Sequence, residues 1–177
     1  MHKIKIPQNY IDNCIARRGS EYIFERIDPK KTALLVIDMQ NCFILPGLSM
    51  VEVPGVGAIA PNINTLAKKI REVGGKVIWT EHVYTPGWSS WYNHFTTEES
   101  REKIVNDTAE GSFAREIWSG MDRKSEDLLI TKTRSSALTP GSSNLKEVLD
   151  DLAIDTLIIT GTLTNVCCES TARDAML

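Results

Sequence analysis

The 177-residue sequence contains no apolar run that approaches the roughly 20 residues of a membrane-spanning helix. Its first residues, Met-His-Lys-Ile-Lys-Ile-Pro, carry charges but lack the apolar segment of a secretory signal. An excess of basic residues is also missing, since 20 Lys and Arg stand against 23 Asp and Glu, for a formal net charge of −3. Phosphate binding needs a concentrated basic face, so we expect neither nucleic acid nor a membrane as a partner. The sequence predicts a cytoplasmic protein.

Cysteine and histidine are both scarce, and neither forms a pattern typical of a disulfide framework or a metal site. His82 and His94 are too far apart to make a metal cluster, and we interpret them as loop residues. We therefore expect free thiols, no metal and no other cofactor. The four cysteines are Cys14, Cys42, Cys167 and Cys168.

The chain does contain alternating strand and helix patterns. Nearly continuous apolar runs predict strands that are buried on both faces, at 33–38, 76–81, 127–131 and 156–160. Between the strands, apolar residues at intervals of three and four predict helices over 58–73 and about 143–152, and another begins near Cys167. Ser142 or Ser143 can cap the second of these helices. Repeated strand–helix–strand units predict a doubly wound α/β fold, with a mostly parallel sheet and helices on both faces in three layers.

Residues 1–30 are polar and irregular, and predict an arm or a short helix rather than a domain. Residues 31–177 are long enough for a single domain with one core. Within that domain, residues 82–125 have the least definite pattern and hold three of the four tryptophans, Trp88, Trp91 and Trp118. Such a segment is typical of a lid or a subunit contact, so we expect a homodimer or homotetramer.

Chemically active residues follow three of the predicted strands. Asp38 ends the first strand, Lys132 follows the third, and Cys167 comes just after the fourth. Ligands of open α/β sheets bind beyond the carboxyl ends of the strands, where the strand order reverses. With the first strand next to the third, in the order 2-1-3-4, the three side chains would meet in one pocket.

Together these residues could carry out nucleophilic catalysis. A thiol attacks only as a thiolate, and a nearby ammonium group or helix N-terminus favours that form. Asp38 could take the proton of Cys167 and return it to a leaving amine, while Lys132 holds Asp38 in place. Backbone N–H groups before Cys167 would face the developing oxyanion. Taken singly, each residue also fits an ordinary structural role; their shared sheet edge favours the functional interpretation.

The sequence contains the segments VIDMQN at 36–41, TKTRSSA at 131–137 and TGTLTNVCCESTARDA at 160–175. They resemble the signature blocks of the isochorismatase-like cysteine hydrolases, in the same order. The resemblance implies that Asp38 is the acid/base, Lys132 the family's lysine and Cys167 the nucleophile in cleaving a C–N bond. It also implies a cis peptide bond at Thr162–Leu163, with the N–H groups of Leu163 and Cys167 forming the oxyanion hole.

Within that family, the third block looks closest to ureidoacrylate-type and other carbamoyl-cleaving amidohydrolases. This implies a small amide, ureido or carbamoyl substrate and a thioester intermediate. Arg134 could bind a substrate carboxylate through its guanidinium fork, although it could equally be a surface residue, and Trp88 is a further candidate for substrate contact. The Asp-x-His metal pattern of nicotinamidases is absent after the second strand. Family members continue with another strand and helix, so we expect the C-terminal part of the fold to be missing from a chain ending at Leu177.

Other functions remain open from the sequence. The chain could be a non-catalytic doubly wound binding protein that has kept the fold, or a nicotinamidase-like or isochorismatase-like hydrolase of another substrate. A thiol-redox role for Cys167 and Cys168 is disfavoured, because adjacent cysteines form only a strained disulfide.

Overall fold

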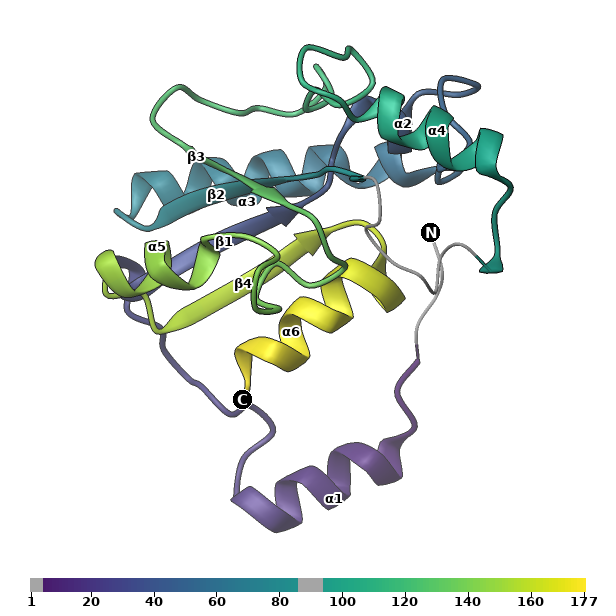
Figure 1. The fold of residues 1–177 in the computed structure, drawn as a ribbon. Helices are drawn as coiled ribbons and strands as arrows, with labels where there is room; N and C mark the ends of the chain where they lie inside the picture. The colour runs from purple at the N-terminus through teal and green to yellow at the C-terminus, as the bar shows by residue number, and fades with distance from the viewer. Residues whose placement is uncertain (1–4, 86–93) are drawn as a thin grey trace.

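The computed structural model describes residues 5–85 and 94–177, and its centre is a parallel β-sheet (Figure 1). The order across the sheet is β3-β2-β1-β4, so the expected contact between the first and third strands is wrong: β2 lies between them. After β3 the chain crosses to the far side of β1, and the strand order therefore reverses between β1 and β4. The strands are β1 (Thr32–Ile37), β2 (Lys76–His82), β3 (Leu128–Lys132) and β4 (Thr156–Gly161).

Helices cover both faces of this sheet, with α3 (Ala60–Glu72) on one face and α5 (Leu145–Asp151) and α6 (Glu169–Ala175) on the other (Figure 1). Every residue of β1 is fully buried as a result. In a central strand that is covered on both faces, any polar side chain is buried and needs a hydrogen-bond partner. The expected three-layer α/β fold is confirmed.

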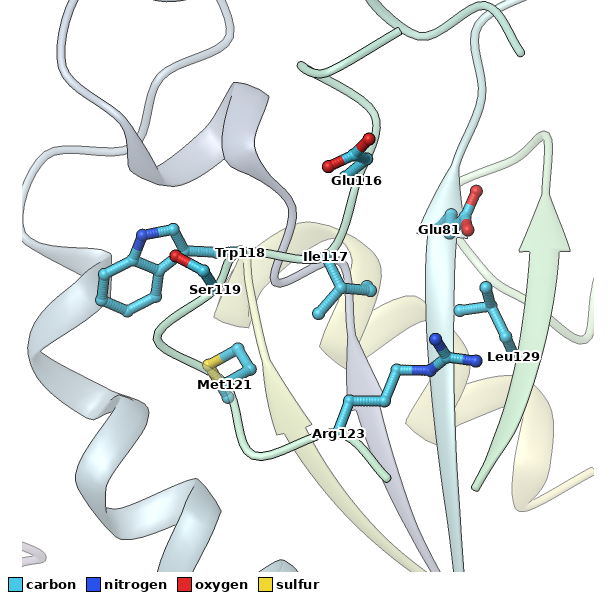
Figure 2. A pocket seen from close by; sticks show the side chains of 8 residues that line it. All are labelled: Glu81, Glu116, Ile117, Trp118, Ser119, Met121, Arg123 and Leu129. Atoms are coloured by element: carbon cyan, nitrogen blue, oxygen red, sulfur yellow. The ribbon is translucent and has the colours of Figure 1, made fainter. Parts of the chain in front are cut away.

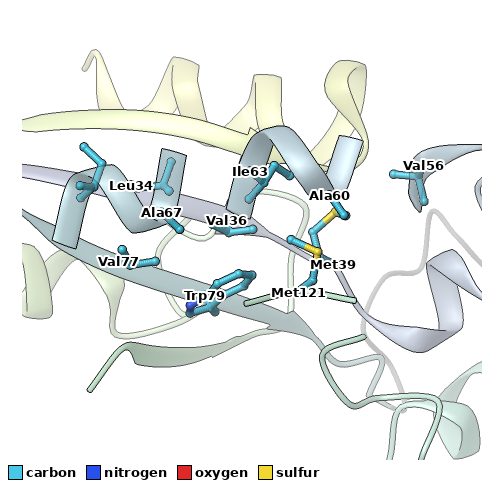
Figure 3. Close-up of a cluster of buried hydrophobic side chains, with 11 residues drawn as sticks. Leu34, Val36, Met39, Val56, Ala60, Ile63, Ala67, Val77, Trp79 and Met121 are labelled. Carbon is cyan, nitrogen blue, oxygen red and sulfur yellow. The ribbon is translucent and has the colours of Figure 1, made fainter. Parts of the chain in front are cut away.

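The α3 layer follows from the spacing of its apolar residues. Ile63, Ala67 and Ile70 recur at intervals of four and three, and all three belong to the buried cluster that contains Trp79. Figure 3 shows Ile63 and Ala67 of this cluster above the sheet. Pro61 lies in the first turn of α3, where the missing N–H costs no hydrogen bond. The short 3-10 turn η2 (Val56–Ile59) leads directly into this helix.

A second apolar cluster fills the space between the sheet and α5. Leu145 and Leu149 of α5 pack against β-strand residues such as Ile37, and Cys167 belongs to the same cluster. The cap of α5 differs slightly from the expectation: Asn144 is the capping position, but Ser143 Oγ accepts the Leu145 N–H at 3.1 Å. This core therefore holds Cys167 against the carboxyl end of the sheet.

Two helices form a third cluster beside that end of the sheet: α2 (Asn41–Ile44) and α4 (Glu98–Asp107). We did not expect α4, because its sequence has only a weak apolar stripe. In the structure Ile104 is its one buried residue. A start signal was nevertheless present in the sequence. Thr97 Oγ1 accepts the Ser100 N–H at 3.2 Å, and two glutamates occupy the first turn.

The start of β3 is fixed by the carboxylate of Asp127. Arg71 of α3 donates to both of its oxygens, at 2.8 and 2.6 Å, and Trp79 Nε1 donates at 2.9 Å. Burial opposes the charged form, but the Arg71 and Trp79 hydrogen bonds lower the pKa of Asp127 below its ordinary value. Asp127 thus stays charged and ties the start of β3 to α3 and β2.

The N-terminal segment lies apart from the sheet. It contains α1 (Gln8–Arg18), which Figure 1 shows away from the sheet, and the 3-10 turn η1 (Pro29–Lys31). No residue of α1 is buried. Several large apolar side chains of this arm are exposed, namely Ile6, Tyr10, Tyr22, Ile23 and Phe24. Within residues 5–85 and 94–177, no helix combines the length and hydropathy needed to cross a bilayer.

Candidate active site

Asp38, Lys132 and Cys167 lie together at the carboxyl edge of the sheet. Lys132 Nζ is 2.7 Å from Asp38 Oδ2 and 3.5 Å from Cys167 Sγ. The residues are 1%, 0% and 8% exposed, respectively. The three therefore meet as expected, although by a different route: β1 and β4 place Asp38 beside Cys167 at the reversal of strand order, and the Lys132 side chain reaches across the end of β2.

A tight turn directs the Asp38 carboxylate into the site. Asp38 has a φ of 53°, a left-handed conformation that Asp tolerates better than most residues, and its carbonyl accepts the Gln40 N–H at 2.8 Å. Thr80 Oγ1 donates to Asp38 Oδ1 at 2.7 Å and accepts the Asp38 N–H at 3.2 Å. One carboxylate oxygen is thus held by Thr80 and the other by Lys132.

We expected His82 in a loop, but it is the last residue of β2. Its side chain is 2% exposed, and its Nδ1 is 2.9 Å from Lys132 Nζ and 3.9 Å from Asp38 Oδ2. Burial and the positive charges of Lys132 and Arg134 hold the pKa of His82 well below its ordinary value. A signal existed in the sequence, because Thr80 and His82 are two residues apart and point to the same face of a strand. The expected strand order 2-1-3-4 put β2 at the edge of the sheet, away from the strand that ends at Lys132. For that reason we did not assign His82 to the site.

The side chain of Gln40 fixes the backbone of His82. Its Oε1 accepts the His82 N–H at 2.7 Å, and its Nε2 donates to the carbonyls of His82 and Arg115 at 3.1 and 2.8 Å. Gln40 is fully buried. These bonds extend the pairing of β1 with β2 beyond the last residues of the strands, so both Asp38 and His82 have a rigid support.

Cys167 lies in the π-helical turn η4 (Thr164–Cys168), which leads from β4 into α6. The Thr162–Leu163 peptide bond before this turn is cis, as expected. Thr171 Oγ1 donates to the Cys167 carbonyl at 2.7 Å and so ties η4 to the first turns of α6. The adjacent sulfur of Cys168 lies instead near the Thr160 carbonyl, at 3.9 Å.

The charge state of Cys167 differs from the expectation. Burial and then the Asp38 charge raise the pKa of Cys167 to about 12, and the opposing effect of Lys132 is smaller. The resting site therefore holds a protonated thiol rather than a thiolate. Asp38 is the nearby group that can accept its proton.

Asp38, His82 and Cys167 also have the spacing of a metal site, because their ligand atoms all lie within 4.8 Å of one another. Lys132 Nζ, however, lies within 4 Å of an atom of each of these residues. Its ammonium group already occupies the position and supplies the positive charge that a cation would bring. The donor set therefore does not fit a metal ion while Lys132 is charged.

Two further candidate residues come from the sequence, Arg134 and Trp88. The Arg134 side chain is exposed and donates to the Thr133 carbonyl at 3.0 Å, while the Arg134 carbonyl accepts a hydrogen bond from Lys132 Nζ at 3.1 Å. Trp88 lies outside the described residues. Trp118 is half-buried and packs against the cluster under α3, not over Cys167.

A separate hollow of about 330 Å³ lies beside β2 and β3 (Figure 2). Glu81 and Trp118 are among its lining residues, and Figure 2 also shows Arg123 and Leu129 at its wall. Successive residues of a strand point to opposite faces, so Glu81 faces this hollow while His82 faces away from it. The hollow is not part of the cluster around Lys132.

Comparison with known proteins agrees with this geometry. The family model of the isochorismatase domain matches residues 32–177. A ureidoacrylate amidohydrolase of Caulobacter vibrioides is 31% identical over 166 residues, which cover 85% of this chain and 73% of that protein. The crystal structure of a cysteine hydrolase from Pseudomonas syringae pv. phaseolicola has a TM-score of 0.73 and 27% identity, covering 85% of this chain and 68% of that one. With a family model that spans the whole sheet and the cluster around Lys132, the chain belongs to the isochorismatase family and is a hydrolase of that family.

Proposed function

We propose that this hydrolase cleaves a C–N bond of a small ureido, carbamoyl or amide compound through a thioester on Cys167. The main support is the contact set of Lys132, whose ammonium lies 2.7 Å from the Asp38 carboxylate and 3.5 Å from the Cys167 sulfur. A base, a fixed positive charge and a nucleophile are thus within reach of one carbonyl group. The similarity to a ureidoacrylate amidohydrolase and to a cysteine hydrolase supports this substrate class.

In the first half of the reaction, Asp38 takes the thiol proton. Because the pKa of Cys167 is raised to about 12, the sulfur becomes anionic only as it attacks the substrate carbonyl. An S–C bond forms and the carbonyl oxygen takes the negative charge. When the intermediate collapses, the C–N bond breaks and Asp38 returns the proton to the leaving nitrogen, so that ammonia or an amine departs.

In the second half, water attacks the thioester carbon. Asp38 accepts a proton from the water, the C–S bond breaks, and the sulfur recovers its proton. The product is a carboxylic or carbamic acid, and the enzyme returns to its starting state. Lys132 remains an ammonium throughout and stabilises the negative charge on Asp38 and on the sulfur.

Three further groups complete this proposal. The N–H groups of Leu163 and Cys167, in the turn between β4 and α6, are the proposed donors to the oxyanion. Arg134 is exposed beside the cluster and is proposed to bind a substrate carboxylate. Trp88 is proposed to contact the substrate.

We also propose a cytoplasmic location. All four cysteines, including the exposed Cys14, are free thiols in the structure, as expected in a reducing compartment. A thiol nucleophile keeps its activity there without protection from oxidation.

The proposed activity is tested by ammonia release from ureidoacrylate, N-carbamoyl amino acids, simple primary amides and nicotinamide. We expect turnover of a ureido or carbamoyl compound that is insensitive to EDTA. Cys167→Ser should lower kcat by about 1,000-fold or more, because it removes the nucleophile. Mass spectrometry of wild-type enzyme, quenched during turnover, should show the acyl group on the peptide that contains Cys167. Undiminished turnover by Cys167→Ser, or a required metal ion, would contradict the proposal.

A further inference from the structure

We propose that His82 is a positioning residue for Lys132: its neutral imidazole accepts an ammonium N–H at Nδ1 and fixes the ammonium between Asp38 and Cys167. The proposal rests on the proposed function, because it assumes that these three residues carry out the reaction. His82 acts through Lys132 and does not need to touch the substrate.

The argument begins with the donors of Lys132. An ammonium group has three N–H donors and no acceptor, so every close polar neighbour has to offer a lone pair. The imidazole nitrogen that faces it is therefore unprotonated, and the neutral ring carries its proton on Nε2. The neighbours of Lys132 Nζ are Asp38 Oδ2 at 2.7 Å, His82 Nδ1 at 2.9 Å, the Arg134 carbonyl at 3.1 Å and Cys167 Sγ at 3.5 Å.

The surrounding charges favour the same neutral form. A protonated His82 would place a second cation 2.9 Å from the Lys132 ammonium, in a site with almost no exposure to water. Arg134 adds another positive charge nearby. The Asp38 carboxylate lies 3.9 Å from the ring, but the Lys132 ammonium lies closer to that carboxylate, at 2.7 Å. The Cys167 thiol is uncharged, since its pKa is raised to about 12.

The imidazole has a support that does not depend on Lys132. The ring of Tyr84 stacks on it, with centroids 4.4 Å apart and planes 25° apart. The Tyr84 N–H in turn donates to Thr108 Oγ1, at the end of α4, at 3.0 Å. Gln40 holds the His82 backbone at 2.7 and 3.1 Å. Residues that follow β1 and β2, and the residue that caps the C-terminus of α4, therefore determine where Nδ1 points.

This arrangement matters because it limits how Lys132 can pair with Asp38. Without an acceptor at Nδ1, the ammonium could move toward the carboxylate and away from the sulfur. Asp38 would then be a weaker base, and the developing thiolate would lose a nearby positive charge. Substitution of His82 should consequently lower kcat while leaving KM nearly unchanged.

The tautomer is tested by ¹⁵N NMR of the wild-type imidazoles, with the His82 signals assigned by their loss in His82→Gln. We expect a neutral ring, protonated at Nε2 and hydrogen-bonded at Nδ1, that does not titrate between about pH 5 and pH 8. In Lys132→Met the ring should titrate at higher pH, since one cause of its lowered pKa is removed. A ring protonated at Nδ1, or doubly protonated at neutral pH, would overturn the proposal. This measurement needs no substrate, so it decides the role of His82 even if no C–N substrate is turned over.

The kinetic test compares two substitutions on the substrate identified by ammonia release. His82→Leu removes the acceptor and should lower kcat about 10- to 100-fold, the usual effect of losing a hydrogen bond to a charged group, with a shifted pH profile. His82→Gln can present a side-chain oxygen to the ammonium and should recover most of kcat. His94→Gln, at an exposed histidine, is the matched control and should behave as wild type. Wild-type kcat and pH profile in a folded His82→Leu would refute the positioning role; if that variant does not fold, the NMR tautomer decides.

Discussion

At the scale of single residues, Cys167 and Cys168 are neighbours with different surroundings. Cys167 Sγ lies 3.5 Å from the Lys132 ammonium, whereas Cys168 Sγ lies 3.9 Å from the carbonyl of Thr160. The turn η4 directs one sulfur to the polar cluster and the other to the backbone of β4. Adjacent position in the sequence therefore says little about which thiol can react.

Cys167→Ala should abolish turnover and Cys168→Ala should keep most of it. The first substitution removes the sulfur beside Lys132, and the second removes a partly buried side chain with no contact to the ammonium. Initial rates of both purified variants, with circular dichroism to verify folding, provide the measurement. An inactive Cys168→Ala together with an active Cys167→Ala would assign the nucleophile to the other sulfur.

Cys167 of the free enzyme should react slowly with iodoacetamide at pH 8. The reactive species is the thiolate, and burial and Asp38 raise the pKa of Cys167 to about 12, so little thiolate exists until the pH rises far above neutrality. Cys14, which is exposed, is the internal control and should be alkylated first. Peptide mapping over a pH series measures both rates. Rapid labelling of Cys167 near pH 7 would mean that the resting site holds a thiolate.

At the scale of elements, the end of β4 depends on a close approach between two strands. Gly161 has a φ of 107°, and a Cβ at this position would lie 2.0 Å from the carbonyl oxygen of Ile37, the last residue of β1. The Ile37 oxygen is a backbone atom and the added Cβ would be bonded to the backbone of residue 161. Neither atom could move without disturbing the sheet. This contact sets the distance between Asp38, which follows β1, and the turn that carries Cys167.

Gly161→Ala should therefore lower the free energy of unfolding by at least about 2 kcal/mol, through backbone strain and the clash with β1. Urea denaturation followed by tryptophan fluorescence measures the change. Gly57→Ala is a suitable control, because a Cβ there would meet its nearest neighbour, Ile44, at an ordinary 3.4 Å. Its effect should stay within about 1 kcal/mol. Equal stability of Gly161→Ala and wild type would show that the strands can separate at this point without cost.

The elements that we predicted and those that we missed differ in hydrophobic pattern. The strands and α3 have dense apolar runs or a regular stripe, and each lies within a few residues of its expected range. Helix α4 has a polar surface and a single buried residue, Ile104, so its signals were limited to the cap at Thr97 and the acidic first turn. Strand order could not be derived from such patterns, because it depends on which connections cross the sheet.

At the scale of the whole molecule, the N-terminal arm exposes several large apolar side chains. Tyr22, Ile23 and Phe24 are 69–70% exposed, and they form a continuous run. Contiguous apolar surface of this kind marks interaction sites more often than free surface. This run of exposed apolar side chains favours an oligomer.

We therefore expect at least a dimer in solution. Size-exclusion chromatography with light scattering measures the mass directly, and a Tyr22→Ser/Phe24→Ser variant tests whether the arm contributes. The variant should shift the equilibrium toward smaller species, because less apolar area would be buried. A stable monomer of about 20 kDa at micromolar concentration would contradict the expectation.

The sequence by itself was enough to determine the fold class and to predict three residues of the candidate site. Buried strands are recognisable because both faces exclude polar side chains, and Asp38, Lys132 and Cys167 stand out because each follows such a strand. Only the tertiary structure decided the place of His82. Whether a residue at a strand end lies in the site depends on which strands are its neighbours, and β2 lies between β1 and β3. The tertiary structure also decided the charge of Cys167. The burial that raises its pKa is produced by α5, η4 and the sheet together, and no local stretch of sequence contains that information.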